Sequence, residues 1–177
     1  MTTDLYDVIL ADPPWPYKDS NRSPSRFYSL MNIDEIVALP VKNHIADNAA
    51  LFLWVTWPHL LSAAWVMEAW GFSYTTLAWV WVKARRSGFA HHVGMGNYTR
   101  SNTEPCLLGI RGSMPVKAHD VLGVIYSPVR LHSRKPDEQY EKIARLYPAA
   151  RPLELFARRR RPGWHVWGNE VRSDIAL

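Results

Sequence analysis

Short apolar runs separated by polar, turn-forming segments recur along the whole chain. Runs that are rich in β-branched and aromatic residues and bounded by Gly, Pro, Asn or Asp are typical of strands buried in a sheet. The sequence predicts such strands over residues 7–11, 51–56, 75–82, 104–110, 121–126, 152–157 and 164–170. Helix signals lie between several of them, so the pattern indicates an α/β protein with helices layered on a sheet.

Three helices are predicted between these strands, over residues 33–39, 58–70 and 136–147. Asn32 followed by Glu35 has the spacing of a capping box, in which each side chain satisfies a free backbone N–H group. Pro58 suits the first turn of the second helix, and Gly71 suits its C-terminal cap.

Composition places the chain among folded domains of ordinary size. It has 177 residues, 47% of them apolar, and this excludes a disordered chain. We expect a single domain over residues 1–177. The net charge of +5 favours a polyanionic partner such as nucleic acid, although ordinary basic solubility would give the same value.

Metal sites and disulfides are not expected. Cys106 is the only cysteine, which leaves no disulfide framework and no cysteine cluster for a metal. His91 and His92 lack a third ligand at a suitable spacing. A reducing, cytoplasmic setting is therefore the default.

The chain is expected to contact no membrane. Its first residues lack the basic and apolar regions of a signal peptide. Residues 49–72 are apolar, but Pro58, His59 and Glu68 interrupt them, and a strand followed by a helix explains them better than a membrane span.

Chemistry is concentrated at Asp12-Pro13-Pro14-Trp15, where the first predicted strand ends. The prolines cannot continue the ladder, and ligands of open α/β sheets bind outside the carboxyl ends of the strands. A carboxylate and a proline carbonyl that accept the N–H bonds of an aromatic amine would leave its lone pair free to react. The tryptophan face suits stacking on an extruded base. A strand end closed by a Pro-Pro turn and a packed tryptophan is the competing interpretation.

Basic residues gather in segments without periodicity. Residues 17–26 and 85–102 are interpreted as surface loops that either meet phosphates or are merely solvated. Arg158–Arg161 has the same two interpretations. Lys135 at a predicted helix N-terminus is unfavourable for the helix dipole, which favours a role toward a ligand.

Six segments occur together in one order: Asp12–Trp15, Leu51–Thr56, Trp81–Lys83, His132–Glu138, Leu153–Arg158 and Trp167–Glu170. In this order they closely resemble the MT-A seventy family of adenine N6-methyltransferases, over nearly the whole chain. The resemblance implies a Rossmann-like class I methyltransferase fold in permuted order, with the catalytic strand first and the cofactor strand last. It also implies S-adenosylmethionine as the cofactor.

The resemblance further implies roles for individual residues. The catalytic set is Asp12, Pro13, Pro14 and Trp15, in which Asp12 contacts the target amine and Pro13 offers its carbonyl. The cofactor-binding set is Asp12, Ser133, Lys135, Glu154, Phe156, Arg158, Asn169 and Glu170. The substrate-binding set is Tyr17, Tyr28, Lys83, Arg85, Arg86 and Arg134.

Two departures from the family pattern matter. Relatives contact the cofactor adenine through residues well upstream of the catalytic motif, whereas here that motif begins at Asp12. This pocket is therefore expected to be formed differently, left open, or completed by a partner. Arg159–Arg161 also replaces a less basic sequence, and no role is carried over beyond Arg158 in that run.

The sequence therefore predicts an S-adenosylmethionine-dependent N6-adenine methyltransferase. DNA is favoured over RNA because the compact size resembles bacterial and phage members. RNA N6-adenosine methylation is the nearest alternative, followed by a non-catalytic nucleic-acid-binding subunit of the same fold. Methylation of a glutamine amide ranks last, because such enzymes carry Asn in place of Asp12. A homodimer and a complex with a partner subunit both stay open.

Overall fold

The computed structural model describes residues 5–16, 30–85, 94, 98–130 and 134–177. In these ranges seven strands form one mixed sheet in the order β5-β3-β4-β2-β1-β6-β7. The strands are β1 (Tyr6–Ala11), β2 (Ile45–Trp54), β3 (Ser73–Ala84), β4 (Thr103–Arg111), β5 (Val124–Pro128), β6 (Pro152–Leu155) and β7 (His165–Trp167). The helices are α1 (Ile33–Val37), α2 (Leu60–Ala69) and α3 (Glu138–Leu146). The predicted α/β, Rossmann-like fold class is confirmed.

Strand β1 lies inside the sheet and runs parallel to both of its neighbours. Ile9 pairs with Leu51 of β2 on one side and with Leu153 of β6 on the other. Strand β4 is antiparallel to both of its neighbours, β2 and β3. Strand β5 is parallel to β3, and β7 is parallel to β6, so β4 alone runs in the opposite direction to the other strands of the sheet. The carboxyl ends of six strands and the amino end of β4 therefore meet at one edge of the sheet.

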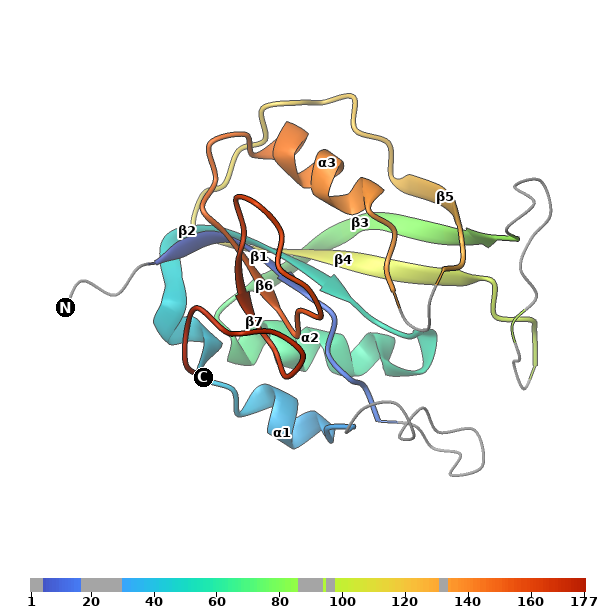
Figure 1. Cartoon of the computed structure of the whole chain (residues 1–177), viewed down its shortest axis with the longest axis horizontal. Coiled ribbons are helices and arrows are strands. Elements are labelled where there is room, and N and C mark those ends of the chain that lie inside the picture. Colours follow the sequence, from blue (N-terminus) through green and yellow to red (C-terminus); the bar gives the residue numbers. More distant parts are fainter. Residues whose placement is uncertain (1–4, 17–29, 86–93, 95–97, 131–133) are drawn as a thin grey trace.

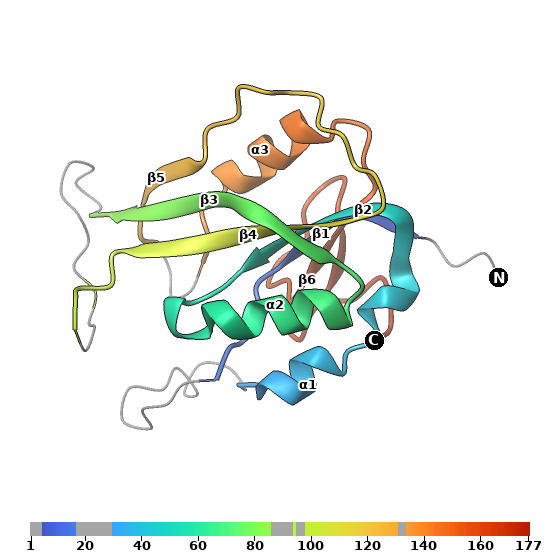
Figure 2. The ribbon, with the colours of Figure 1, turned by 180° about the vertical axis from the view of Figure 1, so that it is seen from behind.

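Helices cover both faces of this sheet: α1 and α2 lie on one face and α3 on the other (Figures 1 and 2). The alternation of side chains along β1 divides the core accordingly. Ile9 packs in one buried cluster with Leu51, Val66 and Trp70, whereas Leu10 packs in the other.

Several element boundaries differ from prediction. Strand β2 begins at Ile45 rather than at Leu51. Its early part was not predicted because Asp47 and Asn48 are polar and exposed and interrupt the apolar pattern. Helix α3 begins at Glu138 rather than at Pro136, and β5 is shifted to Val124–Pro128. Strand β6 stops at Leu155 because Phe156 has a positive φ of 60°, which ends the ladder.

The apolar stretch 49–72 is divided between β2, a short 3₁₀ turn at Trp57–His59 and α2. None of the helices in the described ranges has the length and apolar character of a membrane span. Most of the loop predicted over residues 85–102 lies outside the described residues.

Candidate active site

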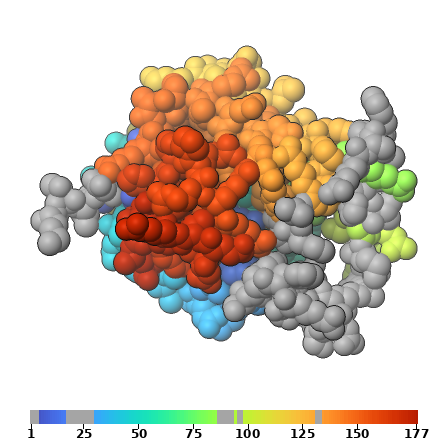
Figure 3. Space-filling view, in the orientation of Figure 1, coloured from blue at the N-terminus to red at the C-terminus, as the bar shows by residue number. Residues whose placement is uncertain are grey.

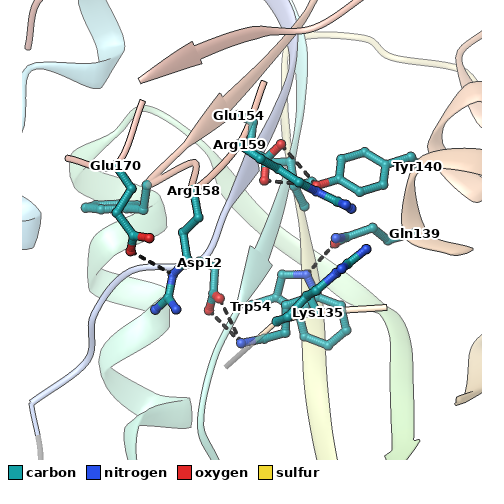
Figure 4. A pocket seen from close by; sticks show the side chains of 12 residues that line it. Asp12, Trp54, Lys135, Gln139, Tyr140, Glu154, Arg158, Arg159 and Glu170 are labelled. Atoms are coloured by element: carbon teal, nitrogen blue, oxygen red, sulfur yellow. Dashed lines mark hydrogen bonds and ion pairs between the residues drawn. The ribbon is translucent and has the colours of Figure 1, made fainter. Parts of the chain in front are cut away.

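A pocket opens at the edge of the sheet where the strands end (Figure 4). Its volume is about 290 Å³, near the lower end for small-molecule sites. The charged lining residues are Asp12, Glu154, Glu170, Arg134, Lys135, Arg158 and Arg159, and the others are Leu10, Trp54, Gln139, Tyr140 and Phe156. Both signs of charge therefore face the same small volume.

Lys135 connects two acidic side chains at one end of this pocket. Its Nζ lies 2.8 Å from both carboxylate oxygens of Asp12 and 2.8 Å from Oε1 of Glu104. Lys83 approaches the other oxygen of Glu104 at 2.9 Å. The four side chains alternate in charge, and the Lys135 side chain is only 9% exposed.

This chain of ion pairs sets the proton affinity of each member. Burial raises the pKa of Asp12, the charge of Lys135 lowers it, and the charge of Glu104 raises it again, so that it lies above its ordinary value. Burial raises the pKa of Glu104 too, but the charges of Lys135 and Lys83 outweigh it and the pKa lies below its ordinary value. Burial lowers the pKa of Lys135, yet the two carboxylates raise it overall, so Lys135 stays charged.

The Pro-Pro turn directs the backbone away from β1. The carbonyl oxygen of Pro13 accepts the N–H of Trp15 at 2.8 Å, which closes a tight turn. The Trp15 indole donates to the carbonyl of Trp54 at 2.9 Å, and its ring stacks on His59 with centroids 5.8 Å apart. Because Trp15 is 5% exposed, the expected open face for a base is absent, and this ring supports the turn from within.

Glu154 forms the opposite wall of the pocket. The Tyr140 hydroxyl lies 3.0 and 3.1 Å from its two oxygens. Burial, only partly offset by this hydrogen bond, raises the pKa of Glu154 to about 7. Next to Tyr140, the buried Gln139 accepts the indole N–H of Trp54 at 2.7 Å and so fixes the pocket floor.

Residues that follow β6 and β7 complete the pocket. The positive φ of Phe156 turns the chain, and the Ala157 N–H donates to the carbonyl of Trp167 at 2.9 Å. This contact brings Arg158 beside Glu170, with Nε 3.5 Å from Oε1.

Six of the residues predicted for the cofactor line this single pocket: Asp12, Lys135, Glu154, Phe156, Arg158 and Glu170. Asn169 is exposed and does not line it, and Ser133 lies outside the described residues.

The residues predicted for substrate binding are more scattered. Lys83 is held by Glu104, and Arg134 lines the pocket while pairing with Asp137. Arg85 is exposed just after β3. Tyr17, Tyr28 and Arg86 fall in segments that the structure does not describe.

The predicted sets omit Glu104 and five residues that line the pocket, namely Leu10, Trp54, Gln139, Tyr140 and Arg159. Glu104 stands at the start of β4, where a polar residue opening an apolar run was the available signal. Because β4 is antiparallel to its neighbours, its first residues meet the last residues of β2 and β3. Among the described residues, no group of three or more His, Cys, Asp or Glu side chains is arranged to hold a metal ion.

Comparisons with known proteins give matches over almost the whole chain. A family model described as MT-A70 matches residues 6–170. The Type II methyltransferase M.MunI of a Mycoplasma species is 34% identical over 94% of this chain and 78% of its own length. An N(6)-adenosine-methyltransferase MT-A70-like protein of Arabidopsis thaliana is 34% identical over 95% of this chain but 24% of its own length. An N6-methyladenosine RNA methyltransferase of Cryphonectria parasitica is 32% identical, over 94% and 52% respectively.

Proposed function

Because this chain belongs to the MT-A70 family, we propose that it is an S-adenosylmethionine-dependent methyltransferase acting on the N6 amino group of adenine in DNA. One observation carries the proposal. The carboxylate of Asp12, at the carboxyl end of β1, faces the pocket together with cofactor-set residues that precede α3, lie in or just after β6, or follow β7 (Figure 4).

The lining residues fit the proposed cofactor. S-adenosylmethionine carries a sulfonium and an ammonium group, and the pocket offers the carboxylates of Asp12, Glu154 and Glu170. Glu154 is half-buried with its pKa raised to about 7, so a nearby cation would stabilise its charged form. Phe156 adds an aromatic surface for the adenine ring, and Glu170 is placed at a strand end, where acidic residues bind ribose hydroxyls.

When bound, the cofactor supplies an electrophilic methyl group: the carbon–sulfur bond breaks as the carbon–nitrogen bond forms, and the amine loses one proton. Asp12 accepts an N–H bond of that amine and localises the lone pair on nitrogen. Its pKa, raised by burial and by Glu104, makes it a stronger acceptor for the departing proton. The Pro13 carbonyl has one lone pair left after binding the Trp15 N–H, and this lone pair accepts the second N–H of the amine.

Lys135 keeps Asp12 ionised in this proposal. Without an ammonium between them, Asp12 and Glu104 would be two neighbouring carboxylates and would retain a shared proton. Both oxygens of Asp12 lie at 2.8 Å from Lys135 Nζ, and each still has a lone pair for the substrate. Lys135 is therefore a positioning residue for Asp12, rather than a free cation waiting for the cofactor carboxylate.

DNA is proposed as the substrate because the compact chain matches the length of a Type II methyltransferase better than that of the relative named for RNA. The chain spans 78% of the length of M.MunI, which is named a Type II methyltransferase, and 52% of the length of the relative named for RNA. The net charge of +5 suits either polyanion. The choice therefore needs a direct comparison of substrates.

The test is transfer of an isotopically labelled methyl group to single-stranded DNA, duplex DNA and RNA of one sequence, with the product identified by mass spectrometry. We expect N6-methyladenine in DNA, and product confined to RNA would assign the alternative substrate. Asp12→Asn should lower kcat by about two to three orders of magnitude, the cost of one preorganised transition-state contact. Asp34→Asn, at an exposed position on α1, is the matched control and should leave kcat unchanged. Turnover by Asp12→Asn at the wild-type rate would refute the proposed role of Asp12.

A further inference from the structure

Four arginines from two distant segments converge on the single carboxylate of Asp137, which precedes α3. Arg130 and Arg134 donate to Oδ2, each at 2.6 Å. Arg161 donates to Oδ1 at 2.9 Å, and Arg159 donates to the same oxygen. We call Asp137 and these four residues the arginine cluster.

The arginine cluster has an excess of positive charge and of donors. Four guanidinium groups against one carboxylate leave three positive charges. Asp137 accepts four hydrogen bonds, which saturates its lone pairs, whereas each guanidinium has five N–H donors and spends one of them here. The buried Nε atoms of Arg134 and Arg161 have no hydrogen-bond partner within the described part of the chain.

The cluster is built into the structure rather than loosely solvated. The four arginine side chains are between 28% and 43% exposed. The Arg161 guanidinium lies 3.7 Å from the ring centroid of Tyr140, close enough for a cation–π contact that fixes its plane. Guanidinium groups held in place in this way bind a tetrahedral oxyanion with a small loss of side-chain entropy.

Its position relates it to the pocket. Arg134 and Arg159 belong both to the cluster and to the lining of the pocket that contains Asp12. Figure 3 shows the C-terminal part of the chain, which carries Arg159 and Arg161, lying directly against the part that includes α3. A group bound at the cluster would therefore lie at the rim of the pocket.

We propose that the arginine cluster binds a backbone phosphate of the nucleic acid and thereby places the target nucleotide at the pocket. Arginine forks match phosphate oxygens in pairs, and four guanidinium groups around one carboxylate have an excess of positive charge that suits an anion. The proposal rests on the proposed function, since it assigns a contact to the same substrate. In this proposal, Asp137 holds the mutually repelling guanidinium groups together before the substrate binds.

The carboxylate of the cofactor is a poorer match for the same groups. S-adenosylmethionine carries two positive charges and one negative charge, so the molecule as a whole is a cation. A cluster with three excess positive charges repels it, and the pocket carboxylates attract it instead. A phosphodiester brings negative charge with no cation attached.

The test measures binding of a fluorescent single-stranded oligodeoxynucleotide to the full chain over a range of salt concentrations. Arg159→Ala and Arg130→Ala each remove one cluster arginine that is well exposed, so both variants should fold. We expect each to weaken binding about tenfold at low salt, as for loss of a hydrogen bond to a charged group. The slope of log affinity against log salt should become shallower by about 0.7, the value for one phosphate on a single strand.

Arg145→Ala is the matched control. Arg145 lies near the other end of α3, is 52% exposed and pairs with one exposed carboxylate, Asp120. It carries the same charge change outside the cluster and should leave affinity and salt slope close to those of the wild type. Equal losses in Arg145→Ala and Arg159→Ala would show a general charge effect and overturn the proposal.

Calorimetric titration of S-adenosylmethionine into the same variants separates the two anions. If Arg159→Ala lost cofactor affinity but kept nucleic-acid affinity, the cluster would serve the cofactor and the proposal would be wrong. Because binding is measured without turnover, the outcomes remain distinct from those of the proposed function. A wild-type chain that transfers no methyl group, yet loses DNA affinity on Arg159→Ala, would refute the function and keep the cluster assignment.

Discussion

Lys135 holds the carboxylate of Asp12 across 123 positions of sequence, with Nζ 2.8 Å from each oxygen. The same ammonium lies 2.8 Å from Glu104, which Lys83 approaches from the other side. The charge on Asp12 is therefore governed by a network of neighbours rather than by Asp12 alone. Two substitutions within this network should move the pKa of Asp12 in opposite directions.

Lys135→Met removes the ammonium between two carboxylates. Asp12 and Glu104 would then share one proton, and the pKa of Asp12 would rise further. We expect methyl transfer to be largely lost at neutral pH and partly regained at higher pH, where Asp12 loses its proton. The fall of kcat/KM on the acidic side of its pH profile reports the pKa of this group in the free enzyme, so that acidic limb should move to higher pH. Breaking a buried ion pair should also cost about 3–5 kcal/mol of stability. Lys142→Met, at a lysine that donates to the Leu122 carbonyl, is the control and should keep the wild-type limb.

Glu104→Gln keeps the shape of the side chain and removes its charge. Since the charge of Glu104 raises the pKa of Asp12, we expect the acidic limb of the pH–rate profile to move to lower pH, opposite to Lys135→Met. Glu104 itself has a lowered pKa, so its stabilising contribution is present at neutral pH and is lost as pH falls through that pKa. Denaturant unfolding should show a loss of about 2 kcal/mol at neutral pH that shrinks in acid. An acidic limb that moved the same way in both variants would contradict the network.

Glu154→Gln tests the raised pKa of Glu154. This carboxyl titrates near 7 in the folded chain against an ordinary 4.5, so the folded state holds the extra proton between these values. Its contribution to stability is full below about pH 4.5 and is lost as pH rises through 7. The Gln variant should lack that decline and gain up to about 3 kcal/mol relative to the wild type between pH 5 and 8. If urea unfolding gave the same difference in stability between the wild type and the Gln variant at pH 5 and at pH 8, the raised pKa of Glu154 would be contradicted.

Local signals were sufficient for most of the fold. The capping box predicted from Asn32 and Glu35 is present, with the two side chains each bonded to the other's backbone N–H. The end of β1 at the prolines follows from the lost donors alone. The order of the strands could not be predicted from local sequence patterns. Strand β4 lies antiparallel between β2 and β3, and an apolar run does not show which strand it pairs with or in which direction.

The family assignment from six segments is confirmed by the model match over residues 6–170. The roles of the individual site residues stay predictions, although six of the cofactor set share one pocket. Glu104 could not be predicted because its partner Lys135 lies in a distant segment, just before α3, and a local pattern does not reveal their contact. The run Arg158–Arg161 left two interpretations open, and only the structure shows that Asp137 collects two of its members.

Gly168→Ala tests how closely β6 and β7 must approach to form the pocket wall. A Cβ at Gly168 would stand 2.3 Å from the carbonyl oxygen and 2.7 Å from the nitrogen of Ala157, both fixed backbone atoms. The two segments would have to separate, which should cost about 1–3 kcal/mol in denaturant unfolding. It should also weaken S-adenosylmethionine binding measured by calorimetry, because Glu170 follows directly and lines the pocket. Gly123→Ala is the control, since a Cβ there meets its nearest atom at an ordinary 3.7 Å. Equal stability of the two variants would show that the close approach at Gly168 is not needed.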